Sequence, residues 1–110
     1  MAQAKTDEFT VKQNKTATML RALGHPARVA IVEHLIKCES CVCGDIVDRL
    51  PLAQATVSQH LKALKDAGLI RGTVEGTSVC YCIDAKAIHF LKAYFSMLDE
   101  RIEQQNQACC

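Results

Sequence analysis

The fold is decided by the stretch Gln54-Ala55-Thr56-Val57-Ser58-Gln59-His60-Leu61-Lys62-Ala63-Leu64, which predicts a helix with two different faces. Val57, Leu61 and Leu64 recur at the spacing of three and four residues that lines one side of a helix. We expect this helix to run from Gln54 to Ala67, because Gly68 is typical of the position just after a helix end.

A second, shorter helix is expected immediately before it, from Asp45 to Leu50. Pro51 ends this helix, since the residue before a proline disfavours helical geometry. Leu52-Ala53 then makes the turn. Two helices joined by so short a turn form a helix–turn–helix, in which the second helix enters the major groove of DNA.

The segments on either side predict the remaining elements. Two helices precede the helix–turn–helix, and Gly24 and Pro26 separate them. A strand pair and a last helix follow it, with Asp84 as the expected cap of that helix. The expected ranges are 8–23 and 26–37 for the first helices, 70–74 and 79–83 for the strands, and 85–102 for the last helix. In the second helix Val29, Val32, Leu35 and Ile36 are the predicted inner face.

This order predicts a mainly α protein with a small β-hairpin, that is, a winged helix–turn–helix. At 110 residues the chain is expected to be a single domain, residues 1–110. The last helix carries an apolar seam at alternating steps of three and four, which is typical of a helix that packs on a partner helix. We therefore expect the terminal helices to form a homodimer through Ile88, Leu91, Phe95, Leu98 and Ile102.

Cysteine is the unusual feature of the composition, with seven copies and no tryptophan. The first ten residues are polar with mixed charge, and no apolar run is long enough to span a membrane. We expect a cytoplasmic protein with reduced thiols and no membrane partner. In that compartment clustered cysteines more often serve metal or redox chemistry than structural disulfides.

Three of the cysteines lie together in Cys38-Glu39-Ser40-Cys41-Val42-Cys43-Gly44-Asp45, directly before the helix–turn–helix. Thiolates are soft ligands that select thiophilic ions. Three sulfurs suit trivalent arsenic or antimony, whereas four would suit zinc, cadmium or lead better. Cys41 and Cys43 do not share a face of a regular helix, so the three thiols converge only if the backbone there is not helical. An ion bound here would distort the start of the first helix of the helix–turn–helix. It would thereby move the second helix, the recognition or reading helix (54–67), off DNA.

The other four cysteines allow more than one interpretation. Cys109 and Cys110 could complete the metal site from the partner subunit, or they could be spare thiols in a frayed tail. Cys80 and Cys82 lie on the strand face opposite Tyr81, where we expect packing or partial exposure rather than a ligand role.

DNA contacts are expected from one local face, because the net charge of the whole chain is only +1. Polar side chains on the first half of the reading helix would reach base edges or phosphates, and basic side chains further along would contact the DNA backbone. The first group is Gln54, Thr56, Ser58, Gln59 and His60, and the second is Lys62, Lys65 and Arg71. His25 is expected to organise the turn between the first two helices.

These motifs together resemble the ArsR/SmtB family of bacterial metal-sensing repressors, over roughly residues 16–102. The residues that carry the resemblance are Leu23-Gly24-His25-Pro26-Ala27-Arg28, Cys41-Val42-Cys43-Gly44-Asp45-Ile46, the reading helix 55–64 and Ala67-Gly68-Leu69-Ile70. The resemblance implies a homodimer that binds a palindromic operator and leaves it when metal binds. It implies arsenic-type ligands at Cys41 and Cys43, with Cys38 nearby. It does not extend to the zinc-type site, because Lys86 and Met97 stand at the expected histidine positions.

Several alternatives differ from this interpretation in the signal or in the class of protein. The same repressor could sense cadmium, lead or zinc, or thiol oxidation or persulfide formation. An enzyme would need a redox dithiol on a βαβ unit, a nucleophile triad or a nucleotide-binding loop, and the sequence contains none of these patterns. We therefore expect no catalytic residues and no catalytic cofactor. A metal buffer without DNA binding is the remaining rival.

Overall fold

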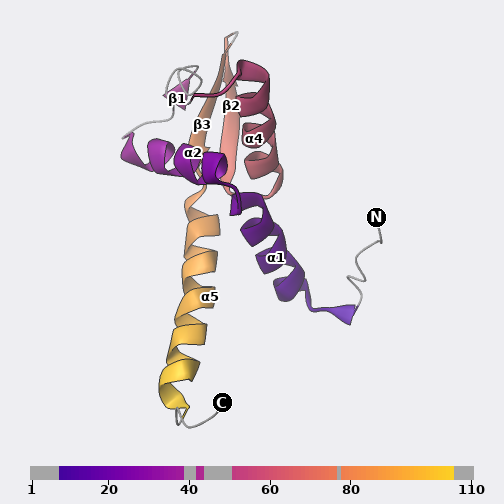
Figure 1. Cartoon of the computed structure of the whole chain (residues 1–110), viewed down its shortest axis with the longest axis vertical. Helices are drawn as coiled ribbons and strands as arrows, with labels where there is room; N and C mark the ends of the chain where they lie inside the picture. The colour runs from indigo at the N-terminus through magenta and orange to yellow at the C-terminus, as the bar shows by residue number, and fades with distance from the viewer. Residues whose placement is uncertain (1–7, 39–41, 44–50, 77, 106–110) are drawn as a thin grey trace.

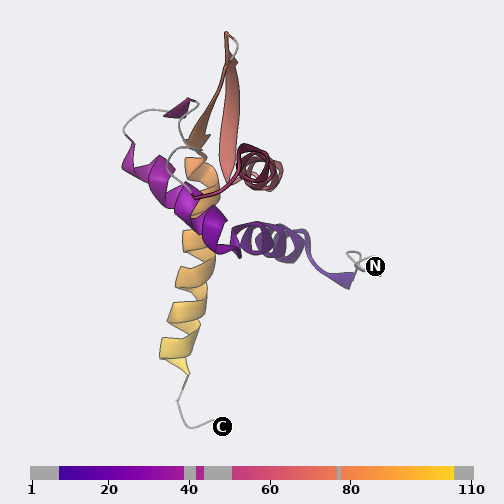
Figure 2. The ribbon, with the colours of Figure 1, turned by 45° about the horizontal axis from the view of Figure 1, so that its top comes forward.

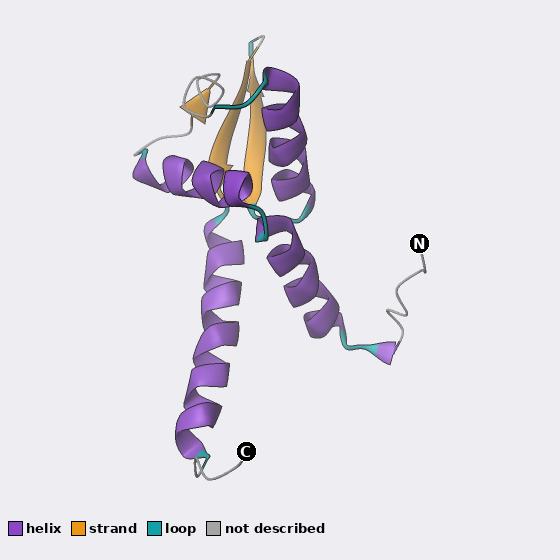
Figure 3. Ribbon diagram, viewed as in Figure 1, coloured by secondary structure: helices purple, strands orange, loops and turns teal. Residues whose placement is uncertain are grey.

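The computed structural model describes residues 8–38, 42–43, 51–76 and 78–105 (Figure 1). Along the chain these form α1 (Val11–Leu23), α2 (Pro26–Lys37), β1 (Val42–Cys43), α4 (Gln54–Asp66), β2 (Ile70–Glu75), β3 (Ser78–Ile83) and α5 (Ala85–Gln104). The predicted mainly α fold with a β-hairpin is confirmed (Figure 3). The short helix expected at residues 45–50 lies outside the described residues.

The sheet has one strand more than the sequence predicted. β2 and β3 form the expected antiparallel hairpin, in which Ile70 pairs with Ile83 and Glu75 with Ser78. β1 adds to the other edge of β3, so the strand order is β1-β3-β2. The short strand that contains Cys43 is therefore attached to the hairpin, the wing of the fold.

Capping residues explain where the helices begin. α1 starts at Val11 rather than at Glu8, because Thr10 caps it and forms a reciprocal pair of hydrogen bonds with Gln13. At α2, the Nδ1 atom of His25 accepts a hydrogen bond from the backbone N–H of Ala27, which confirms the expected role of this histidine. Asp84 caps α5 in the same way through the backbone N–H of Lys86.

The core lies between α2, α4 and the hairpin. Its largest fully buried side chains are Ile31, Leu64, Leu69, Ile70, Val57 and Cys80. The predicted inner face of α2 is wrong in two positions. Ile31 and Leu35, four residues apart, point into the core, and this orientation leaves Val29 and Ile36 exposed.

A tight turn connects α4 to the wing. Gly68 has a φ of +83°, a left-handed conformation that glycine adopts without strain. Its backbone N–H donates to the carbonyl of Lys65, and the N–H of Leu69 donates to the carbonyl of Leu64 at 3.0 Å. β2 begins at Ile70, so a short hydrogen-bonded turn joins the end of α4 directly to the start of the hairpin.

α1 and α5 extend away from this compact part as two separate arms (Figures 1 and 2). The chain measures 55 × 35 × 24 Å along its principal axes. No helix among the described residues is both long enough and apolar enough to cross a membrane.

Candidate DNA-binding and thiol sites

α4 presents the polar face that the sequence predicted for DNA. Its apolar positions Val57, Leu61 and Leu64 are buried in the core. The opposite face is open, and among the predicted contact residues Gln54, Ser58, Gln59, Lys62 and Lys65 are exposed and Thr56 is half-buried. Arg71, on the adjacent strand β2, is also exposed. The helix therefore offers amide, hydroxyl and amino groups to the outside along its length.

His60 is the exception among the predicted contact residues, because its side chain is buried. Only 8% of its surface is exposed. Its Nδ1 atom accepts a hydrogen bond of 3.0 Å from Nε of Arg28, and its ring lies 4.5 Å from that of His25. A side chain held in this way presents little of its surface to a base or a phosphate.

The contacts of His60 connect three helices. Besides its bond to His60, Arg28 of α2 donates from Nη1 to the carbonyl oxygen of Ala22 in α1, at 3.1 Å. Burial lowers the pKa of His60 below its usual value, and the nearby charges of His25 and Arg28 lower it further. A neutral imidazole keeps Nδ1 free to accept the hydrogen bond, so this cluster holds the reading helix in place.

Lys62 and Asp66 form an ion pair on the exposed face of α4. Lys62 Nζ lies 2.8 Å from Asp66 Oδ2, one helical turn away. The hydrogen bond and the charge of Asp66 raise the pKa of Lys62. The pair offsets part of the positive charge that the helix presents.

The first clustered cysteine, Cys38, is described and half-buried. It ends α2 and packs against the hydrophobic core. Cys41, Cys109 and Cys110 lie outside the described residues. Within the described part of the chain, no three histidine, cysteine or acidic side chains are grouped closely enough to hold a metal ion.

The pairing of β1 with β3 brings cysteines from distant parts of the sequence to neighbouring positions. Cys43 lies directly opposite Cys80, and Val42 lies opposite Tyr81. Cys80 is buried and Cys82 is half-buried, as the sequence predicted for these two residues. Both are also disulfide-bonded. The two disulfide-bonded cysteines therefore lie on β3, next to the strand β1 that contains Cys43.

Sequence reasoning missed this juxtaposition because it depends on strand pairing across almost forty residues of chain. One feature of the sequence could have indicated this pairing, namely a motif that occurs twice. Cys41-Val42-Cys43 and Cys80-Tyr81-Cys82 are both Cys-x-Cys motifs with a bulky apolar or aromatic residue between the two cysteines. A strand places the two cysteines of such a motif on one face.

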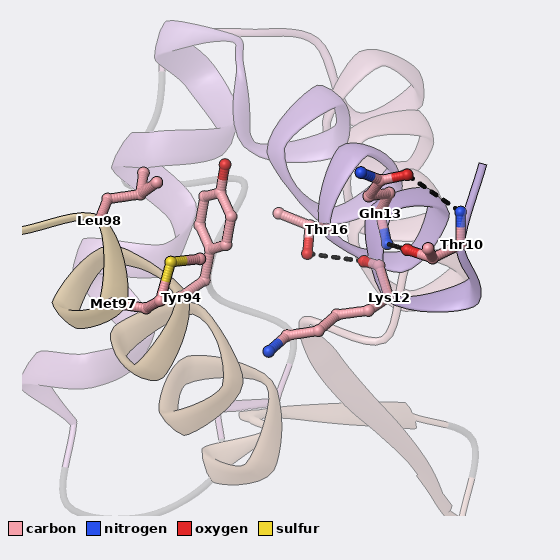
Figure 4. A pocket seen from close by; sticks show the side chains of 7 residues that line it. All are labelled: Thr10, Lys12, Gln13, Thr16, Tyr94, Met97 and Leu98. Carbon is pink, nitrogen blue, oxygen red and sulfur yellow. Dashed lines mark hydrogen bonds between the residues drawn. The ribbon is translucent and has the colours of Figure 1, made fainter. Parts of the chain in front are cut away.

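The predicted dimer seam of α5 is open in the single chain, except at one position. Phe95 is 51% and Ile102 54% exposed, and Ile88 and Leu98 are also exposed. Leu91 instead belongs to the chain's own core, because it lies near the start of α5, where this helix joins the compact part. Further along, a hollow of about 380 Å³ separates α5 from α1. Figure 4 shows its lining of Thr10, Lys12, Gln13, Thr16, Tyr94, Met97 and Leu98.

This architecture defines a winged helix–turn–helix protein. Residues 25–71 match the family model of the bacterial regulatory protein arsR family. The chain is 37% identical over 83 residues to an uncharacterised HTH-type transcriptional regulator of Methanocaldococcus jannaschii, which covers 74% of this chain and 92% of that protein. The chain belongs to the arsR family of transcriptional regulators.

Two further similarities concern function and fold. The chain is 48% identical over 63 residues to the HTH-type transcriptional repressor SmtB of Mycobacterium tuberculosis, which covers 57% of this chain but only 46% of that protein. It therefore spans about half of the length of this relative. A crystal structure of a possible transcriptional regulator for arsenical resistance superimposes with a TM-score of 0.63 and 25% identity, over 82% of this chain and 98% of the other. The first of these is named as a transcriptional repressor and the second as a possible transcriptional regulator.

Proposed function

We propose that this chain is a transcriptional repressor that binds double-stranded operator DNA as a homodimer and dissociates when a thiophilic ion binds its cysteines. The proposal rests on α4. Its polar face is exposed and its apolar face is buried, in a chain of the arsR family. An exposed helix of this kind fits the major groove. The compartment we propose is the cytoplasm, whose reducing conditions would return Cys80 and Cys82, disulfide-bonded in this structure, to thiols.

For DNA, Gln54, Ser58 and Gln59 would reach base edges, since they are exposed on the first half of α4. Glutamine has the donor and acceptor needed to read adenine through two hydrogen bonds. Thr56, Lys62, Lys65 and Arg71 would contact phosphates and fix the register. His60 is not part of this set, because it is buried against Arg28.

The homodimer would form through α5. Phe95, Leu98 and Ile102 leave an apolar strip exposed on an arm that projects from the compact part of the chain. A second copy that packs on this strip would remove it from water, which is the main driving force for such an interface. Two reading helices related by a two-fold axis would then match the two halves of a palindromic operator.

The inducer would be trivalent arsenic or antimony, bound by thiolates of the segment that contains Cys38, Cys41 and Cys43. Arsenite, As(OH)₃, exchanges its three hydroxyl groups for three cysteine sulfurs. Each thiol proton leaves with one hydroxyl group as water, and arsenic stays trivalent. Three soft sulfurs in one site favour such an ion over hard cations. The name of the arsenical-resistance relative supports this choice over cadmium, lead or zinc.

Thiol oxidation is the second candidate signal, and one observation favours it: Cys80 and Cys82 are disulfide-bonded. A peroxide would oxidise two thiols to one disulfide and would itself be reduced to water or alcohol. The DNA-binding part of the proposal is the same for both signals.

One titration tests these alternatives. The full chain is bound to fluorescent DNA from its own promoter region, and anisotropy is followed as arsenite, antimonite, cadmium, zinc or hydrogen peroxide is added. We expect release by arsenite or antimonite under reducing conditions, and loss of this response in Cys41→Ser and Cys43→Ser. Failure to bind this DNA at all would contradict the repressor. Release by peroxide alone would establish the oxidative signal instead.

A further inference from the structure

His60 is a polar side chain on the otherwise apolar, buried face of the reading helix α4. It shares this face with Val57, Leu61 and Leu64, at steps of three and four residues. Apolar contacts attract without a preferred direction, whereas a hydrogen bond depends on the angle between donor and acceptor. The hydrogen bond of His60 therefore selects one rotation of α4 about its own axis.

Arg28 provides the donor of this hydrogen bond, and its side chain connects two other helices. Its Nε atom donates to Nδ1 of His60 at 3.0 Å, and its Nη1 atom donates to the carbonyl oxygen of Ala22 at 3.1 Å. Ala22 lies in the last turn of α1, where carbonyl groups have no partner within the helix. Because the guanidinium group is planar and rigid, it fixes the angle between the two bonds. A single side chain of α2 thus sets the orientation of α4 relative to the end of α1.

This arrangement requires that the imidazole of His60 is neutral. Nδ1 accepts a hydrogen bond, so the ring carries its one proton on Nε2. A second proton would occupy Nδ1 and would point at the N–H group of Arg28, with two donors and two positive charges facing each other. Protonation of His60 therefore breaks the bond that sets the rotation of α4.

The groups nearest to His60 favour its neutral form. Burial lowers the pKa of His60, and the charges of His25 and Arg28 lower it further. The His25 ring lies 4.5 Å from the His60 ring, at the start of α2. His60 is therefore neutral at pH 7, and it takes up a proton only as the pH falls below about 6.5 towards its lowered pKa.

Other charged groups on the elements that pack against α4 are directed to solvent. The exposed charged side chains are Lys12, Lys15 and Arg21 of α1, Glu33 and Lys37 of α2, and Arg71 of β2. On α4 itself, Lys62 and Asp66 pair with each other on the exposed face. His34 of α2 is six residues beyond Arg28, about 9 Å along the helix axis. The protonation of His60 is thus governed by Arg28 and His25.

We propose that Arg28 and His60 are positioning residues for operator binding, and that protonation of His60 releases α4 from the orientation in which it reads DNA. This inference rests on the proposed function, because it concerns the same helix and the same operator. It adds a response to acid that needs no thiol. Gln59, proposed to contact a base edge, directly precedes His60, so a rotation of α4 displaces it from the bases. Attraction to phosphates depends less on this rotation.

The experiment measures the affinity for DNA as a function of pH. The full chain, reduced and free of metal, is titrated onto its promoter DNA and onto scrambled DNA of the same length, at constant ionic strength. Fluorescence anisotropy gives the affinity from about pH 8 to about pH 5.5, a range that brackets the usual pKa of histidine. Circular dichroism at each pH shows whether the helices remain folded.

Two variants of His60 separate its proton from its hydrogen bond. His60→Asn places an amide oxygen close to the position of Nδ1, so it retains an acceptor for Arg28 but does not titrate. His60→Leu removes the acceptor and leaves the donor of Arg28 without its partner. His89→Asn changes an exposed histidine of α5 and is the matched control.

We expect the wild-type affinity for promoter DNA to fall at least about tenfold between about pH 7.5 and pH 5.5, the equivalent of one hydrogen bond with a charged partner. Affinity for scrambled DNA should stay level or rise, because histidine protonation adds positive charge. His60→Asn should bind promoter DNA like the wild type at about pH 7.5 and keep that affinity in acid. His60→Leu should bind it weakly throughout, and His89→Asn should follow the wild type.

Two further variants test the partners of His60. Arg28→Lys keeps the positive charge without the rigid fork, so it should weaken binding to promoter DNA but not to scrambled DNA. Wild-type affinity in Arg28→Lys overturns the role of Arg28. His25→Asn retains a side chain that caps α2 and removes the second titrating ring, so the fall in acid should persist. Loss of the fall in His25→Asn assigns the acid response to the cap and overturns the role of His60.

The remaining outcomes are equally decisive. A wild-type affinity for promoter DNA that is constant or rises in acid overturns the inference, and so does a fall that persists in His60→Asn. An equal fall on promoter and scrambled DNA, or a fall that coincides with loss of the helical signal, also overturns it. Absence of promoter binding by the wild type at about pH 7.5 would instead overturn the proposed function.

Discussion

The two edges of the small sheet are stabilised by different interactions. β2 forms one edge and packs against α4, while β1 forms the other edge and brings Cys43 beside the wing (Figure 1). The α4 edge is held by apolar side chains at helical spacing, with one polar cluster around His60. The β1 edge is a two-residue strand whose neighbours include cysteines. The DNA-binding helix α4 is therefore held by its own apolar face, whereas the β1 edge depends on its pairing with β3.

The largest expected effect is on the α4 edge, from Leu64→Ala. Leu64 is fully buried between α4 and the hairpin, and truncation of such a leucine typically costs about 2 to 5 kcal/mol in the free energy of unfolding. Urea denaturation of the reduced chain measures the change. Val74→Ala is the matched control, because Val74 is exposed on the wing and should change stability little. A small loss at Leu64 would mean that α4 is not anchored by its apolar face.

The difference between the two edges also explains what the sequence could predict. The spacing of Val57, Leu61 and Leu64, with Gly68 after them, lies within a single helix, so local periodicity revealed α4 almost to the residue. The turn and caps of the hairpin and of α5 were local in the same sense. β1 was missed because a two-residue strand has no periodicity of its own and exists only through pairing with β3.

The sequence predicted the orientation of some individual side chains poorly, for a related reason. On the sequence, His60 is one more polar residue on a polar helix, and only its contact with Arg28, thirty-two residues away, shows that it faces inward. Likewise Leu91 fits the α5 seam by spacing, but the start of that helix lies against the core. Spacing indicates which residues share a face of a helix, whereas tertiary contacts decide which face each position finally turns to.

The second prediction addresses the reading function of the α4 edge. Gln59→Ala removes an exposed amide proposed to contact a base edge, and loss of such a contact costs about 1 to 3 kcal/mol in binding to the operator. Anisotropy with operator and with scrambled DNA measures it, and the loss should be confined to the operator. Gln104→Ala, at the end of α5, is the matched control. An equal loss on both DNAs would assign Gln59 to the phosphate backbone.

The third prediction concerns the polar cluster behind α4. The pKa of His60 is lowered in the folded chain, so at a pH below its usual value of about 6.5 the unfolded chain binds the proton more readily. The free energy of unfolding should therefore fall as the pH drops from about 6.5 towards the lowered pKa. Urea denaturation at a series of pH values measures this slope.

The same pH dependence of the free energy of unfolding is measured in His60→Gln and in a control variant, His89→Gln. The first removes the titrating group and should flatten the part of the slope that His60 contributes. The second changes an exposed histidine on α5 and should leave the slope as in the wild type. If His60→Gln kept the full slope, the acid sensitivity would arise elsewhere and not from the cluster that holds α4.

The smallest expected effect is that of Asp66→Ala. This variant distinguishes the contribution of the Lys62–Asp66 ion pair from that of the apolar packing on the same helix. Asp66 and Lys62 are 61% and 76% exposed, and exposed ion pairs contribute little to stability. The variant should unfold like the wild type but bind DNA slightly more tightly at low salt, because Lys62 is no longer paired. The logarithmic dependence of affinity on salt should steepen by up to about one unit if Lys62 gains a phosphate contact. Loss of stability comparable to that of Leu64→Ala would mean that α4 is held by charge as well as by its apolar face, and the contrast between the two edges would no longer stand.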